Sequence, residues 1–177
     1  QYWSWSLEPA FGYFSKPPLL VGLIRLSTEL FGDGLLGVKA LAMVAWLLAS
    51  AVLWRLGAAM GNERAGVVGA ALLAASTASG LLGLSVTTDA ALMLFWSLVM
   101  LGAWRAAHAT GAAAWRWWVL TGVALGLAVL SKYTAGALSL SALWLLWRCP
   151  REQRGRLLAG LALAAGIAAL LLLPHLF

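Results

Sequence analysis

WWVLTGVALGLAVLSKYTAGALSLSALWLLW, residues 117–147, holds a single charged side chain, Lys132, between Arg116 and Arg148. As one helix these 31 residues would extend about 46 Å, which is long even for a tilted crossing of ~30 Å of hydrocarbon. Ser131 and Gly136 beside the lysine are compatible with a turn. We therefore expect a helical hairpin with Lys132 at its outer tip, and this hairpin decides the side of every later loop.

The composition of the whole chain is that of a membrane protein. Its 177 residues are 63% hydrophobic and 10% charged, whereas soluble domains carry about 25% charged residues. Charges leave six apolar stretches between them, residues 40–54, 65–88, 90–104, 117–131, 133–147 and 157–174. The predicted fold is all-α, a polytopic membrane protein with about six transmembrane helices.

The distribution of arginine predicts the orientation. Alternating crossings put eight arginines on one side, namely Arg55, Arg64, Arg105, Arg116, Arg148, Arg151, Arg154 and Arg156. Cytoplasmic loops are rich in Lys and Arg, so this side is expected to be cytoplasmic. Residues 1–37 then form an extracytoplasmic loop with a juxtamembrane helix, and residues 38–177 form the transmembrane helical bundle. The inner segment RCPREQRGR, residues 148–156, is interpreted as a solvated basic loop.

The juxtamembrane helix is expected over residues 19–31. Arg25 and Glu29 lie four apart on one face, and the leucines at helical spacing on another are Leu19, Leu23, Leu26 and Leu30. The segment is too short and too charged to span a bilayer, so it is expected to lie on the outer membrane surface. Residues 32–34, Gly-Asp-Gly, should end it before the first crossing.

Several classes of function are excluded by what the sequence lacks. The net charge of +6 comes from basic residues dispersed at helix ends, without the stripe that a nucleic-acid-binding protein needs. A single cysteine, Cys149, cannot form an intrachain disulfide. The sequence contains no Gly-rich nucleotide loop, no metal-spaced His/Cys cluster and no Gly-x-Ser-x-Gly elbow, so nucleotide-driven and serine-hydrolase chemistry have no support.

Three isolated charges fall at predicted outer helix ends: Lys16, Asp89 and Lys132. Lys16 stands just before Pro17 and Pro18, which fit the first turn of a helix, and Asp89 opens an apolar helix. Each has a structural alternative, since a lysine can snorkel to lipid headgroups and a carboxylate can cap a helix N-terminus. Together they suit the headgroup of a phosphate-bearing amphiphile whose tail lies in lipid.

Other outer residues are weaker candidates for substrate contacts. Tyr2 and Tyr13 could line a sugar or prenyl contact, or belong to an aromatic belt at the interface. Glu8 could pair with Lys16, although a solvated loop residue is the simpler interpretation. His175, after Pro174 at the outer end of the last crossing, could contact substrate or metal, but a lone histidine is weak support.

Three segments resemble the dolichyl-phosphate-mannose protein mannosyltransferase family: QYWSWSLEPAFGYFSKPPLLVGLIRLSTELFG (1–32), TTDAALMLFW (87–96) and GLAVLSKYTA (126–135). The likeness is to its bacterial branch, which includes the aminoarabinose transferases of lipid A modification. It implies a partial glycosyltransferase C fold. Within the motifs, Lys16 resembles the family's basic residue near the donor phosphate, and Lys132 the lysine of a Ser/Thr-Lys turn. Asp89 resembles the acidic residue of a Thr-Asp helix start and is the catalytic candidate within this sequence, expected to orient a lysine or the acceptor.

The resemblance implies that a hexosyl or pentosyl group moves from a polyprenyl-phosphate donor to a lipid, protein or glycan acceptor. The site would face the periplasm, at a bacterial inner membrane. The family's main catalytic Asp is expected upstream of Gln1, and relatives continue past His175, so this fragment is expected to be inactive alone. No cofactor is certain; a divalent metal stays open, although Ser15 departs from the Asp or Glu frequent at that position. The alternative function is a transporter or flippase for a phosphate-bearing lipid.

Overall fold

Every regular element in the described part of the chain is a helix. The computed structural model describes residues 4–5, 17–76 and 87–176. The elements are α2 (Leu19–Phe31), α3 (Leu35–Met60), α4 (Glu63–Ala75), α6 (Thr88–His108), α7 (Gly111–Ser131), the 3₁₀ helix η1 (Tyr133–Ala137), α8 (Leu138–Arg148) and α9 (Arg151–Leu176). The all-α prediction is confirmed.

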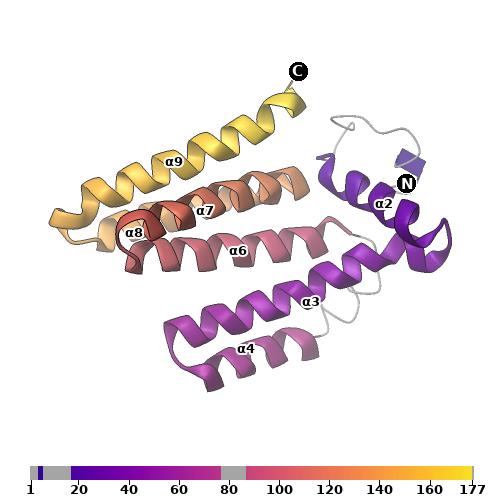
Figure 1. The fold of residues 1–177 in the computed structure, drawn as a ribbon, viewed down its shortest axis with the longest axis horizontal. Coiled ribbons are helices and arrows are strands. Elements are labelled where there is room, and N and C mark those ends of the chain that lie inside the picture. Colours follow the sequence, from indigo (N-terminus) through magenta and orange to yellow (C-terminus); the bar gives the residue numbers. More distant parts are fainter. Residues whose placement is uncertain (1–3, 6–16, 77–86, 177) are drawn as a thin grey trace.

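Four long helices lie side by side in the order α3, α6, α7 and α9, and each packs against the next (Figure 1). The helix α4 packs along α3, and α2 crosses the N-terminal end of α3. The polypeptide direction alternates in sequence order from α3 to α9. The N-terminal end of α6 and the C-terminal ends of α7 and α9 therefore lie at the same end of the bundle (Figure 1).

Within the described residues, four helices are long and apolar enough to cross a membrane: Leu35–Met60, Thr88–His108, Gly111–Ser131 and Arg151–His175. The polytopic membrane fold is thereby confirmed. Two of the six expected crossings are shorter in the described residues, because α4 has 13 residues and α8 has 11, about 20 Å and about 16 Å of helix. The apolar stretch that contains α4 continues into residues 77–86, outside the described part.

The helical break expected at Lys132 is present. The helix α7 ends at Ser131, and Lys132 adopts extended backbone angles, φ −161° and ψ 129°, before η1 begins. The Ser131 hydroxyl donates to the Leu127 carbonyl at 2.8 Å, so this fully buried side chain is satisfied by its own helix. Residues 117–147 are therefore two helical segments and not one tilted crossing.

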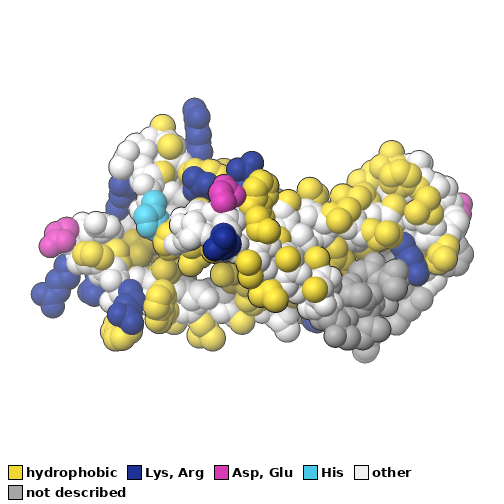
Figure 2. All heavy atoms as spheres, turned by 90° about the horizontal axis from the view of Figure 1, so that it is seen from below, with side chains coloured by type: hydrophobic (Ala, Val, Ile, Leu, Met, Phe, Trp, Pro, Cys, Tyr) yellow, Lys and Arg dark blue, Asp and Glu magenta, His cyan; other side chains and the backbone are white. Residues whose placement is uncertain are grey.

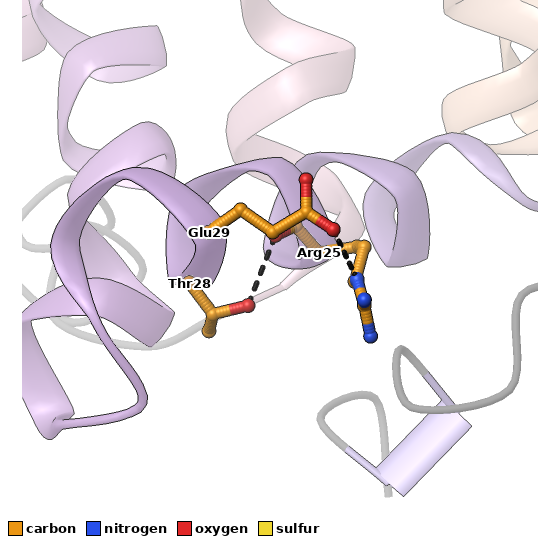
Figure 3. Close-up of polar contacts among 3 residues, drawn as sticks. All are labelled: Arg25, Thr28 and Glu29. Atoms are coloured by element: carbon orange, nitrogen blue, oxygen red, sulfur yellow. Dashed lines mark hydrogen bonds and ion pairs between the residues drawn. The ribbon is translucent and has the colours of Figure 1, made fainter.

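The helix α2 has the bounds predicted for the juxtamembrane helix, and Gly32 follows it with a φ of 81°. Its buried face is formed by Leu20, Ile24 and Ser27, and the Leu41 N–H of α3 donates to the Ser27 hydroxyl at 3.3 Å. Two of the four periodic leucines, Leu26 and Leu30, are 47% and 63% exposed. Arg25 Nε donates to Glu29 Oε1 at 2.6 Å on the outer face, beside the Thr28 hydroxyl bond to the Arg25 carbonyl (Figure 3).

Residues 148–156 are mostly exposed, as predicted, but the prediction that they form a loop is wrong. Only Cys149 and Pro150 separate α8 from α9, which begins at Arg151. Pro150 can precede a first turn without losing a helical hydrogen bond, and Glu152 in that turn interacts favourably with the helix dipole. The basic segment therefore continues the bundle as helix.

Small residues set the spacing between α7 and α9. A Cβ atom added at Gly122 would lie 2.8 Å from the Ala164 carbonyl oxygen, and one at Gly160 would overlap the buried Trp118 ring. Helices in a membrane gain little from the hydrophobic effect, so they depend on such close backbone approach for van der Waals contact. This packing fixes how the end of α9 sits against the end of α7.

Candidate functional site

An ion pair joins the start of α6 to the end of α7. Lys132 Nζ donates to Asp89 Oδ1 at 2.8 Å, across 43 residues of sequence. The two side chains are 35% and 29% exposed, so the pair is partly shielded yet open to solvent or ligand. The structure thus brings together two of the three outer charges that the sequence singled out.

The local backbone explains how each partner is held. Asp89 lies in the first turn of α6, where the helix dipole favours a carboxylate. Thr87 is the N-cap residue, but its side chain makes no capping bond, and its buried hydroxyl oxygen has no partner among the described residues. Lys132 caps the end of α7 in an extended conformation, and its amino group lies at the start of the neighbouring helix.

The pair leaves hydrogen-bonding capacity on the lysine. An ammonium group has three N–H donors and only one is directed at Asp89. The carboxylate fixes the position of the ammonium while the remaining donors can meet an anion. This arrangement can bind and orient a phosphate, because a lysine acts on phosphate as a point charge.

A second polar contact involves Tyr133, the residue that follows Lys132 in the sequence. Tyr133 Oη and His175 Nε2 are 2.8 Å apart, and their rings stack with centroids 5.9 Å apart. The contact ties η1 to the last turn of α9, and it brings His175 to the residue that follows Lys132. The sequence singled out His175 as a site residue but not Tyr133. The position of Tyr133 directly after the Ser-Lys turn could have indicated it.

Four predicted site residues, Lys16, Tyr13, Tyr2 and Glu8, lie outside the described residues. The chain that follows them is described. Pro17 is fully buried, and α2 shares a small cavity with α6, lined by Leu20 and Ile24 of α2 and by Ala90 and Ala91 beside Asp89. The helix α2 therefore packs close to the start of α6.

The described residues hold no group of three or more His, Cys, Asp and Glu side chains that could bind a metal ion. The described part of the candidate site consists of Asp89, Lys132, Tyr133 and His175 at one end of the helical bundle. At the opposite end lie the eight arginines from Arg55 to Arg156, on the helix ends that flank the links. Figure 2 shows basic side chains gathered there, with hydrophobic side chains over much of the remaining face.

These features define a polytopic helical membrane protein with a charged site at the end of the bundle away from the eight arginines from Arg55 to Arg156. The family model described as dolichyl-phosphate-mannose-protein mannosyltransferase matches residues 15–177, and the chain belongs to that family. The family resemblance found in the sequence is thereby confirmed.

One curated relative is similar to most of the chain. It is the lipid A galacturonosyltransferase RgtD of Rhizobium johnstonii, which is 32% identical over 139 residues. The match covers 75% of this chain and 28% of the length of that relative. No solved structure matches the chain significantly.

Proposed function

We propose that this chain is part of a glycosyltransferase that moves a sugar from a polyprenyl-phosphate donor to a lipid, protein or glycan acceptor. The observation that carries the proposal is the ion pair between Lys132 and Asp89, 2.8 Å long, at the end of the bundle opposite the arginines. Membership of the mannosyltransferase family and similarity to a lipid A galacturonosyltransferase support a glycosyl group as the group that is transferred.

In this proposal the protein spans the inner membrane, and its site opens to the periplasm. The distribution of arginine supports this orientation, because the segments between crossings that are rich in Lys and Arg tend to stay on the cytoplasmic side. Residues 1–37 would then be extracytoplasmic and residues 38–177 would form the bundle below them. A polyprenyl tail would lie in the hydrocarbon, and its phosphate would reach the site at headgroup depth.

The roles of the charged residues follow from the chemistry of transfer. The acceptor hydroxyl oxygen attacks the anomeric carbon, the bond from that carbon to the phosphate oxygen breaks, and the phosphate leaves with an additional negative charge. Lys132, with Lys16, would stabilise this charge, and such stabilisation is strong in a site of low dielectric constant. Asp89 would orient Lys132 or the acceptor. The acceptor proton passes to a general base of the whole enzyme.

The competing function is movement of an intact phosphate-bearing lipid across the bilayer. The experiment uses the natural full-length protein in vesicles with a polyprenyl-phosphate sugar labelled in the sugar. Free polyprenyl phosphate together with labelled acceptor supports transfer. Appearance of the intact labelled lipid in the opposite leaflet, with no free polyprenyl phosphate, would replace the transferase proposal with a flippase.

A further inference from the structure

The arginine end of the bundle is rich in cations that have no acidic partner. Arg55, Arg64, Arg105, Arg116 and the four arginines of residues 148–156 lie there, and the ion pairs among the described residues, Arg25–Glu29 and Lys132–Asp89, involve none of them. Clustered cations without carboxylate partners raise the local concentration of anions.

A pocket of about 80 Å³ lies at this end between α6, α7 and the start of α9. This volume is several times the ~10–15 Å³ that one water molecule requires. The pocket is lined by both apolar and polar side chains, namely Ala106, Ala107, Trp118, Cys149, Gln153, Arg156 and Leu157. It is therefore suited to a group that is itself part apolar and part charged.

Arg156 supplies the fixed charge of the pocket. Its Nη2 donates to the Ala109 carbonyl at 2.6 Å, which ties the guanidinium to the α6–α7 link. A guanidinium has five N–H donors, so most remain for an anion. The Gln153 amide lines the same pocket, and both residues lie in the first turns of the 26-residue helix α9, whose dipole is positive at this end.

We propose that this pocket binds the phosphate group of an anionic glycerophospholipid from the leaflet on the arginine side. Basic pockets between transmembrane helices on the cytoplasmic side are suited to such headgroups. The apolar side chains of Ala106, Trp118 and Leu157 would meet the glycerol and the start of the acyl chains, while Arg156 and Gln153 meet the phosphate. This site is separate from the proposed transferase site at the other end.

The test is native mass spectrometry of the delipidated full-length protein titrated with phosphatidylglycerol. Two variants change the pocket in different ways. R156Q removes its charge, and A107W, at an exposed residue of the lining, fills its volume without changing the charge. Each should weaken phosphatidylglycerol binding by about tenfold or more, as expected for loss of a charged hydrogen bond or its site. R156K should lose less than R156Q.

The matched control is R64Q, which removes an arginine from α4, away from the pocket. It should lower binding by no more than the ~5-fold that one surface charge contributes. Equal losses in R156Q and R64Q, or unchanged binding in A107W, would overturn the pocket in favour of diffuse attraction. Equal binding of phosphatidylcholine, or full competition by glycerol phosphate, would overturn the assignment to an anionic lipid.

Discussion

Asp89 and Lys132 face each other because α6 and α7 are antiparallel neighbours, so that the first turn of α6 meets the residue that follows α7. Their 2.8 Å contact closes the end of the α6–α7 hairpin away from its link at Ala109 and Thr110. The ion pair therefore has a structural role as well as the proposed role at the phosphate, and the two roles can be separated by experiment.

Lys132→Met should lower the free energy of unfolding by about 1 kcal/mol, because the pair is about one-third exposed and is therefore only moderately strong. Thermal unfolding in detergent measures the change. The double variant with Asp89→Asn should recover part of the loss, since it leaves no carboxylate without its cation. Strictly additive effects of the two substitutions would contradict an interaction between them.

Gly122→Val should destabilise the bundle by about 1–3 kcal/mol, because the added atoms meet the Ala164 backbone and force α7 away from α9. Gly166→Ala is the matched control on α9. A Cβ there meets nothing within 4 Å, so its helix propensity should raise stability by up to about 1 kcal/mol. Similar unfolding temperatures for the two variants would show that α7 and α9 do not approach closely.

Tyr133→Phe should loosen the end of α9 by removing the hydroxyl that lies 2.8 Å from His175. Amide hydrogen exchange should become several-fold faster over residues 171–176 and stay unchanged in the middle of α7, since the lost bond is worth about 0.5–1.5 kcal/mol. Unaltered exchange at the end of α9 would mean that this contact does not hold the helix.

Cys149, the single cysteine of the sequence, offers a test of orientation. In a full-length background without other cysteines, a membrane-impermeant maleimide should label Cys149 only after the cells are permeabilised. Asp33→Cys in the exposed α2–α3 turn, placed on a Cys149→Ser background, is the complementary variant and should be labelled in intact cells. The reverse pattern would invert the proposed topology.

The sequence predicted the helices well where charges, glycine or proline mark their ends. The bounds of α2 and the break at Lys132 followed from periodic leucines, the Gly-Asp-Gly turn and the excessive length of residues 117–147. The charge of residues 148–156 correctly indicated solvent exposure, but a loop did not follow from it, because arginine, glutamate and glutamine are also good helix formers.

The candidate site was only partly predictable. Isolated charges at helix ends identified Asp89 and Lys132, but their direct contact depends on how α6 packs against α7. The contact of Tyr133 with His175 depends in turn on the spacing between α7 and α9, which small residues such as Gly122 determine. Sequence periodicity predicts which face of a helix is buried, but it does not predict which neighbouring helix packs against that face.

The central claim, that Lys132 acts on the donor phosphate, is tested most directly by single-turnover release of polyprenyl phosphate from labelled donor by the full-length protein. Lys132→Met should slow release by about 100-fold or more, while Lys132→Arg keeps the cation and should retain most of the rate. Arg64→Gln, away from the site, should match the wild type. Release by Lys132→Met within a few-fold of the wild-type rate, from protein of normal stability, would contradict the account.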